Sequence, residues 1–263
     1  MPSIIDPAIC TCSEDVSRER SRGSNHGFTI IEIMVTIGII GVLFSISLPA
    51  LLGARTRASE LKSLTNARSI VSDMQAYADA KGTYPFVVIE PGGAAPVPIW
   101  PPGSMQILEQ VWSLSWAWPG LVAEVAPWEE HYETWISPGR ENVTLAYDTG
   151  FFTSYRYSTS FLASPALWSG SAAADESLIA PTRPTDVAHP SNKVLVWDGD
   201  LAYLPKAPVV VEGFKNHNTP MAFADGHAAT HNPLDATPGV ENPFNGASDL
   251  LFNTPDGVRG RDY

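Results

Sequence analysis

The chain has 263 residues, and 16 lysines and arginines against 28 aspartates and glutamates give it a formal net charge of -12 at pH 7. Proteins that bind nucleic acids need a cationic surface to displace counterions from phosphates, so this charge argues against a nucleic-acid partner. Apolar residues make up 44% of the chain, which excludes a largely disordered protein. The length suffices for one large domain or two small ones with a sizeable core.

The first distinctive segment is an apolar stretch near the N-terminus. Between Glu32 and Arg55 lie 22 consecutive residues without a formal charge, most of them apolar. About 20 helical residues cross the hydrocarbon core of a bilayer, and the stretch lacks the polar stripe of a soluble core helix. We therefore predict a membrane-spanning helix. The alternatives are a buried helix of a globular protein and a cleaved secretory signal, whose apolar region is shorter, usually about 7–15 residues.

Glu32 stands at the start of this stretch. A carboxylate deep in lipid costs about 2.5–3.5 kcal/mol, so an intramembrane position predicts a charged partner. The alternative is that Glu32 lies at the level of the lipid headgroups and is solvated there. Its place at the helix start also suits the positive end of the helix dipole.

The residues around Glu32 resemble the processing site of type IV prepilins and type II secretion pseudopilins. Gly27 is followed by an aromatic residue, Phe28, and Glu32 is the fifth residue after the glycine. Pro49 occupies the place where many pilin helices kink. The resemblance covers residues 27–85. It implies that a prepilin peptidase cuts between Gly27 and Phe28 and methylates the new N-terminus on Phe28.

This resemblance also implies a function. The chain would be a non-enzymatic structural subunit, a pseudopilin or minor pilin, that joins other pilin subunits through an assembly platform. The product would be a type II secretion pseudopilus or a type IV pilus-like filament. Glu32 would meet the N-terminal ammonium of a neighbouring subunit and set the axial register, because opposite charges attract strongly where the dielectric is low.

The resemblance sets the orientation as well, because the basic residues do not. Three arginines precede the apolar stretch and three basic residues follow it, so the positive-inside count is a tie. The implied location is the bacterial inner membrane, crossed once, with the N-terminus in the cytoplasm and the C-terminal domain exported. After assembly the filament would lie in the periplasm or at the surface.

Four segments are expected. They are a cleaved leader (1–27), a transmembrane and filament-core helix (28–54), its amphipathic continuation (55–82) and an exported globular domain (83–263). Both cysteines, Cys10 and Cys12, precede the expected cut, so the remaining 236 residues (263 minus 27) contain none. The exported domain therefore has no disulfide to stabilise it.

Beyond the apolar stretch the pattern becomes amphipathic. Apolar residues at helical spacing predict one buried stripe, made of Leu61, Leu64, Ala67, Val71, Met74 and Ala78. The helix should end near Lys81, with Gly82 as its cap. A continuous helix over 28–80 should bend or locally melt at Pro49 and Gly53, because proline removes a backbone hydrogen bond.

The fold class predicted for the whole is α+β, with the long helix packed on a small antiparallel sheet that carries long loops. A proline-rich loop is expected over 91–102, a short helix over 105–118, a mobile loop over 169–175, and a tail over 232–263 that wraps the surface. Short runs rich in β-branched and aromatic residues predict the strands: Thr144–Tyr147, Thr153–Ser158, Lys193–Trp197, Val209–Glu212, Met221–Ala224 and Ala228–His231.

A second resemblance lies near the C-terminal end of the chain. The run 191–200, His217 and the run 223–227 resemble the C-terminal part of prepilin-like proteins abundant in planctomycete-type bacteria. Seven residues separate His217 from Asp225 here, a shorter gap than in that group. Physically, Asp225 and Gly226 predict a hairpin turn, because glycine accepts a positive φ and aspartate tolerates it.

Two metal sites are alternatives to a purely structural turn at Asp225 and Gly226. Zinc would use His217, Asp225, His227 and His231. Calcium would use the oxygens of Asp198, Asp200 and Asp225, and some major pseudopilins hold calcium in their C-terminal loops. No other cofactor is indicated.

Eight tryptophans favour core packing, although exposed rings would suit a sugar or a partner surface. The main alternative function is therefore a membrane-tethered module that binds a glycan or an ion without polymerising. A tethered zinc hydrolase that uses the late histidines is the third.

Overall fold

The computed structural model describes residues 27–99, 103–140, 153–204 and 216–263. The chain divides into two compact units, residues 1–49 and 50–263. Helix α1 (Ile30–Lys81) is followed by two antiparallel sheets and by short helical turns. The α+β fold class, with a long N-terminal helix and small antiparallel sheets, is confirmed.

Helix α1 contains 52 residues and stays helical through Pro49 and Gly53, so the local melting predicted there is not observed. Its end is where the sequence predicts it. Gly82 has a φ of 81° and donates its N–H to the carbonyl of Ala78 over 2.7 Å. This left-handed cap favours glycine, which has no Cβ to clash.

The larger sheet has four strands in the order β3 (Tyr155–Tyr157), β4 (Val194–Asp198), β5 (Thr219–Phe223) and β6 (Ala228–His231). Each lies where a strand is predicted. The other two predicted strands, Thr144–Tyr147 and Val209–Glu212, fall outside the described residues. Every residue of β3, β4 and β5 is buried, so this sheet is covered on both faces.

The second sheet is a hairpin of β1 (Ala95–Ile99) and β2 (Ser104–Leu108). The loop predicted over 91–102 is wrong for β1, and the helix predicted over 105–118 is wrong for β2, because both segments are strands. Prolines are tolerated in β1 because it is an edge strand. Pro96 and Pro98 are two residues apart, so their missing N–H groups share one edge of the strand, and their neighbours Ala95 and Val97 are buried.

Short helices connect the two sheets. The α-helical turns are α2 (Leu114–Ala117), α3 (Pro119–Val122) and α4 (Trp128–His131). Single 3-10 turns occur elsewhere among the described residues: Val111–Ser113, Tyr132–Trp135, Thr159–Phe161, Pro165–Trp168, Glu176–Leu178, Pro184–Asp186, Pro190–Asn192, Pro233–Asp235 and Gly257–Arg259. The helix predicted over 105–118 is thus reduced to α2 and one 3-10 turn.

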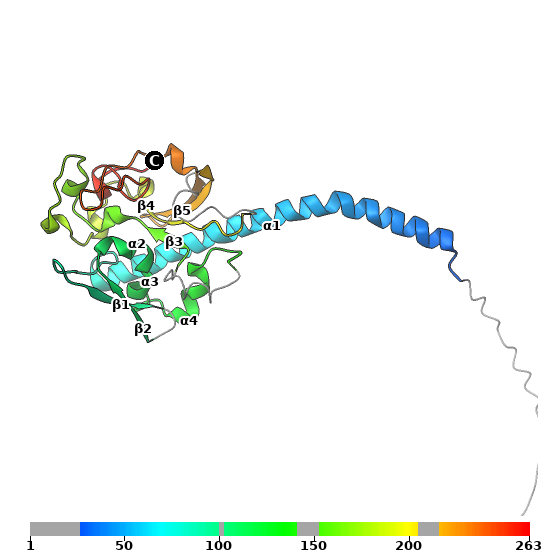
Figure 1. The fold of residues 1–263 in the computed structure, drawn as a ribbon, viewed down its shortest axis with the longest axis horizontal. Helices are drawn as coiled ribbons and strands as arrows, with labels where there is room; N and C mark the ends of the chain where they lie inside the picture. Colours follow the sequence, from blue (N-terminus) through cyan, green and yellow to red (C-terminus); the bar gives the residue numbers. More distant parts are fainter. Residues whose placement is uncertain (1–26, 100–102, 141–152, 205–215) are drawn as a thin grey trace, which may run out of the picture. The chain divides into compact units, whose positions relative to one another are not determined.

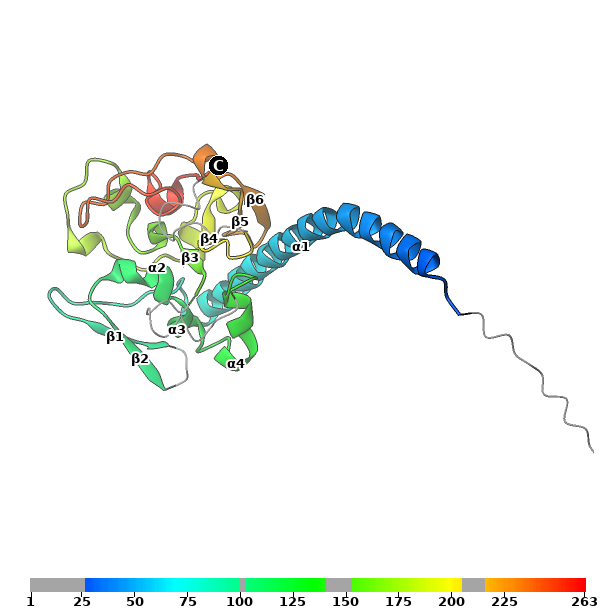
Figure 2. The ribbon, with the colours of Figure 1, turned by 45° about the vertical axis from the view of Figure 1, so that its right-hand side comes forward.

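The main core forms around the C-terminal part of α1. In both views, the cyan end of α1 lies between the sheet β3–β6 on one side and α4 with the β1–β2 hairpin on the other (Figures 1 and 2). Ile70, Val71 and Met74 are fully buried there with Tyr155, Tyr157 and Trp118. The helix packs on the sheet as predicted, and the short helices cover its opposite face.

The buried face of α1 differs in part from the predicted stripe. Ala67, Val71, Met74 and Ala78 are buried as expected, but Leu61 is 64% exposed. The predicted set also omits Ile70 and Tyr77, which are buried. The face is wider than one stripe because α1 is covered from two sides.

A second core cluster lies against the other face of the sheet. Val194, Trp197 and Met221 pack there with Leu251. The tail, residues 232–263, therefore supplies part of the core rather than only wrapping the surface. Its two short 3-10 turns are its only regular elements among the described residues.

Candidate functional site

The N-terminal half of α1 exposes nearly all of its apolar side chains. Ile30 is 79% exposed and Phe44 68%. The most apolar window of α1 has a mean hydropathy of 2.3, and none of it is buried. Within the described residues, α1 alone has the length and composition of a membrane span. The alternative of a buried globular helix does not fit this exposure.

Glu32 closes the first turn of this helix. Its Oε2 accepts hydrogen bonds from the N–H of Thr29 at 2.8 Å and from the Thr29 hydroxyl at 2.9 Å. The Thr29 hydroxyl in turn accepts from the N–H of Glu32 at 3.2 Å. This reciprocal arrangement is a capping box, which satisfies backbone donors that have no partner inside the helix.

The capping role is absent from the sequence-based interpretation, although the sequence contains its signal. A threonine followed three residues later by a glutamate, just before an apolar run, is a helix-start signature. Both Thr29 bonds go to Oε2, and no described residue bonds to Oε1. Since a carboxylate offers about four lone-pair sites, Glu32 has the capacity for a further donor.

Two other predicted positions lie in the same unit. Gly27 is exposed and precedes the helix, so the peptide bond between Gly27 and Phe28 lies outside regular structure. Pro49 is inside α1, and the kink expected there stays a prediction. The leader residues before Gly27, including both cysteines, lie outside the described residues.

Asp198, a predicted calcium ligand, accepts four hydrogen bonds from within the protein. It lies at the end of β4 and is fully buried. Its Oδ2 accepts from the hydroxyls of Ser63 and Ser137, each at 2.6 Å. Its Oδ1 accepts from the N–H groups of Asp200 at 3.1 Å and Leu201 at 2.9 Å. The carboxylate therefore ties α1, the 137–140 turn and the sheet together.

Burial dominates the protonation of Asp198. Desolvation raises the pKa of its carboxyl to about 6, while the hydrogen bonds from Ser137 and Ser63 work in the opposite direction. The buried phenol of Tyr155 bonds to the Ser63 hydroxyl at 3.0 Å. Desolvation and the nearby Asp198 raise the pKa of Tyr155 well above its usual value. These groups form a buried polar network.

Asp200, the next predicted ligand, is already paired. Its carboxylate accepts from the Arg140 guanidinium, which also donates to the Ser154 hydroxyl at 3.2 Å. Arg156 is buried beside it, and desolvation lowers the pKa of the Arg156 guanidinium. Cationic neighbours of this kind disfavour a metal ion at Asp200.

Asp225 and Gly226 form the predicted hairpin turn between β5 and β6, which confirms that interpretation. Gly226 has a φ of 93° and donates to the carbonyl of Phe223 at 2.9 Å. The turn also contacts α1, because the Gln75 amide donates to the carbonyl of Ala224 at 3.0 Å. The motif therefore fixes the sheet to the helix.

Two of the late histidines, His227 and His231, contact side chains close to them. His227 Nδ1 lies 2.6 Å from Asp225 Oδ1, and its ring stacks on Phe223 with centroids 4.2 Å apart. His231 stacks on Tyr263 at 4.6 Å. Among the residues that the structure describes, no three or more His, Cys, Asp or Glu side chains are grouped as metal ligands. Neither the zinc set nor the calcium set is brought together.

A buried ion pair, also absent from the sequence-based interpretation, joins the tail to the sheet. Lys193 Nζ lies 3.3 Å from Asp262 Oδ1, with both side chains at most 1% exposed. Asp262 Oδ2 accepts from the N–H of Val194 at 2.7 Å, and Thr254 bonds to both charged groups. Desolvation lowers the pKa of Lys193, while Asp262 opposes that shift.

Comparison with known proteins identifies the N-terminal segment. Residues 22–48 match the family model of the prokaryotic N-terminal methylation motif. The chain is 29% identical over 117 residues to type II secretion system core protein G of Dickeya chrysanthemi, a match that covers 44% of this chain and 70% of that protein. No solved structure matches the chain.

Two further relatives match shorter stretches. The type IV major pilin protein PilA of Myxococcus xanthus is 32% identical over 69 residues, 26% of this chain and 30% of that protein. Core protein G of Pectobacterium carotovorum is 39% identical over 60 residues, 23% of this chain and 38% of that protein. These matches confirm the resemblance to prepilins: the chain has an N-terminal methylation motif and is similar to core protein G and to a type IV pilin.

Proposed function

We propose that this chain is a structural subunit, a pseudopilin or minor pilin, of a type II secretion pseudopilus or a type IV pilus-like filament. In this proposal a prepilin peptidase removes residues 1–27 and methylates Phe28. The helix of residues 28–54 then anchors the chain in the inner membrane, with residues 83–263 exported. An assembly platform transfers the subunit from lipid to filament, and no enzymatic reaction is assigned.

The observation that carries the proposal is the exposed apolar surface of residues 28–52, from Phe28 through the first half of α1. An apolar surface of this size needs lipid or other apolar helices to cover it. Two environments in succession, a bilayer and then a bundle of like helices, meet that need. The similarity to core protein G and to PilA supports the same sequence of events.

Glu32 has two parts in this proposal. Its Oε2 caps the helix through Thr29, and its Oε1 receives the N-methylated ammonium of Phe28 from a neighbouring subunit. Glu32→Gln separates the two parts, since the amide oxygen still accepts from Thr29 while the charge is lost. Glu32→Ala removes both.

Filament yield tests the charge pairing. Cysteines placed along residues 33–52 should give a crosslinked ladder in the wild-type chain and none in Glu32→Ala or Glu32→Gln, although both variants still insert into the membrane. Glu60→Gln, a charge loss farther along α1, is the matched control and should keep the ladder. A normal ladder from Glu32→Gln would refute the charge pairing, and the absence of any ladder in wild type would favour a tethered monomer.

Processing and orientation have separate measurements. Mass spectrometry of the membrane-extracted chain should find an N-terminus at methylated Phe28. Protease added to spheroplasts should digest residues 83–263 and leave the membrane helix. An intact leader, or digestion only from the cytoplasmic side, would contradict the proposal.

A further inference from the structure

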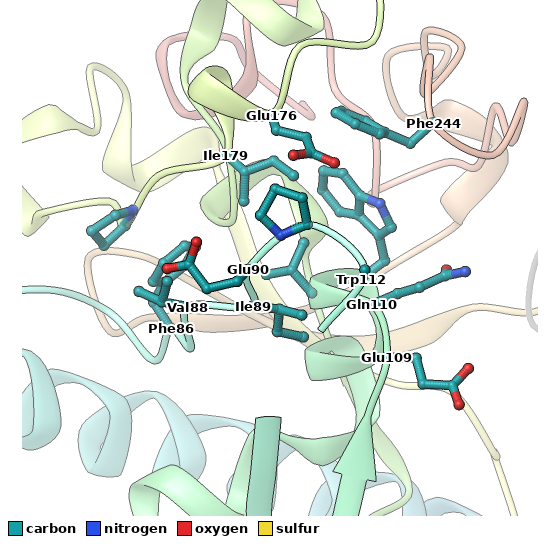
Figure 3. A pocket seen from close by; sticks show the side chains of 14 residues that line it. Phe86, Val88, Ile89, Glu90, Glu109, Gln110, Trp112, Glu176, Ile179 and Phe244 are labelled. Atoms are coloured by element: carbon teal, nitrogen blue, oxygen red, sulfur yellow. The ribbon is translucent and has the colours of Figure 1, made fainter. Parts of the chain in front are cut away.

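The second unit contains a half-open cavity of about 440 Å³ that neither the membrane helix nor the Asp198 network explains. Its walls come from segments far apart in the sequence: residues 86–92 after α1, residues 109–112 after β2, residues 176–181 and Phe244 (Figure 3). This volume is in the range of small-ligand pockets, about 300–1,000 Å³.

Three aromatic rings line the cavity: Phe86, Trp112 and Phe244. The rings of Trp112 and Phe244 are tilted by 47° with centroids 5.8 Å apart. Behind Trp112 lies the fully buried Trp168, in an edge-to-face contact at 5.7 Å. Because Trp168 supports it, Trp112 presents a fixed aromatic face while staying partly exposed.

All the charged residues that line the cavity are acidic: Glu90, Glu109 and Glu176. None of them forms an ion pair with a residue in the described part of the chain. In Figure 3 Glu176 lies near Phe244, Glu90 lies on the side of Phe86 and Val88, and Glu109 extends outward. The cavity thus combines aromatic walls with three carboxylates that have no ion-pair partner among the described residues.

This combination favours one class of ligand. An anion would be repelled by the three carboxylates, and a neutral apolar molecule would gain nothing from them. A cation is attracted by the carboxylates and by the faces of aromatic rings, Trp above all. The aliphatic side chains of Val88, Ile89 and Ile179 would cover an apolar stem.

We propose that this cavity binds an organic cation, namely an ammonium group, bare or alkylated, on a short apolar stem. Such a group occurs both in free amines and in the lysine side chain of a partner protein. The site is independent of filament assembly, so its test and the assembly test can fail separately.

The test uses the full chain in maltoside micelles, whose headgroup carries no cation, with calorimetry or ligand-observed NMR as the readout. Choline is the first probe, and its neutral isostere, in which tert-butyl replaces trimethylammonium, is the second. Choline should bind about tenfold more tightly than the isostere. Salt should weaken the binding of choline, because the rim is exposed.

Variants connect the binding to this cavity. Glu90→Gln with Glu176→Gln should weaken choline binding about tenfold. Both residues are exposed, so the fold should persist. Glu129→Gln with Glu133→Gln, an equal charge loss at exposed positions outside the cavity, should leave affinity unchanged. Trp112→Leu should weaken binding further, and Trp112→Phe should restore part of it.

A third probe, lysine with an acetylated N-terminus and an amidated C-terminus, distinguishes the two sources of the ammonium group, a free amine and the lysine side chain of a partner protein. If it binds as tightly as choline, the ligand is a protein side chain; if choline alone binds, the ligand is a free small cation. The proposal is overturned if neither cation shows binding at a concentration of about 10 mM, which is weaker than a specific small-ligand site requires. It is also overturned if the isostere matches choline, or if the Glu90/Glu176 variant binds like wild type.

Discussion

The two halves of α1 belong to one helix and have opposite relations to their surroundings. Residues 30–49 are exposed on every face, and residues 63–78 bury one wide face against the sheet and the short helices. Two isoleucines show the contrast: Ile40 is 44% exposed and Ile70 is fully buried. An unbroken helix therefore contains one segment built for a folded core and one built for an apolar medium.

Covered polar side chains of the second half differ from the exposed ones of the first half. In the first half the hydroxyls of Thr36 and Ser45 donate to carbonyls of their own helix, Glu32 at 2.7 Å and Val42 at 2.8 Å. In the second half the covered Ser63 and Gln75 donate to other segments, Asp198 and Ala224, while the exposed Thr65 still donates within the helix. Helices in lipid must satisfy polar groups internally, so the local bonding of the first half suits a bilayer.

Matched alanine substitutions in the two halves of α1 test the contrast between them, and they should give the largest change in the free energy of unfolding. Ile70→Ala removes a fully buried side chain and should lower the free energy of unfolding by about 2–5 kcal/mol. Ile40→Ala should leave the unfolding of residues 50–263 unchanged. Chemical denaturation of the full chain in micelles measures both. Equal losses in the two variants would show that the halves are not energetically distinct.

The buried carboxyl of Asp198 should make the stability of the second unit depend on pH. Since burial raises its pKa from 3.8 to about 6, the folded state binds the proton more tightly than the unfolded state does. Its contribution is complete below about pH 4 and is lost as pH rises through 6, a change of up to about 3 kcal/mol.

Unfolding at pH 4.5 and at pH 7.5 measures this contribution. The difference between the two should shrink in Asp198→Asn and persist in Asp79→Asn, a control at an exposed position of α1. An unchanged difference in Asp198→Asn would assign the pH dependence to other groups.

The hairpin turn against α1 should have a smaller effect. Gly226→Ala places a side chain at a φ of 93°, and a left-handed conformation costs an alanine about 1–2 kcal/mol. Thermal unfolding should register this loss. Gly53→Ala, in α1 with open space around its Cα, should instead be neutral or stabilising.

The capping box should have the smallest effect, confined to one helix end. Thr29→Ala should weaken the start of α1 by about 1 kcal/mol, and Thr29→Ser should restore it. Amide exchange at residues 30–33 in micelles is the measurement. Thr36→Ala, which removes a hydroxyl from the same helix without touching the cap, should leave exchange at these residues unaltered.

Local signals account for what the sequence predicts correctly. The apolar run, the glycine at 82 and the Asp225–Gly226 pair each act over a few residues, and each element lies where expected. The sequence does not predict the β1–β2 hairpin, because Pro96 and Pro98 favour a loop unless the strand is known to lie at the edge of a sheet.

The features of the candidate site that the sequence does not predict depend on residues far apart in the chain. Asp198 suggests a metal ligand until Ser63 and Ser137, 135 and 61 residues away, are seen to donate to it. The cavity likewise joins residues from 86 to 244, and no local pattern reveals that they meet.

The Lys193–Asp262 pair has a consequence for the order in which the domain folds. Lys193, which directly precedes β4, gains its buried carboxylate partner only from a residue 69 positions later, and an unpaired buried charge is strongly unfavourable. A chain that emerges from its N-terminal end, at the ribosome or in the proposed export, therefore lacks this partner until Asp262 has emerged. We expect the closure of the domain to be a late event in folding.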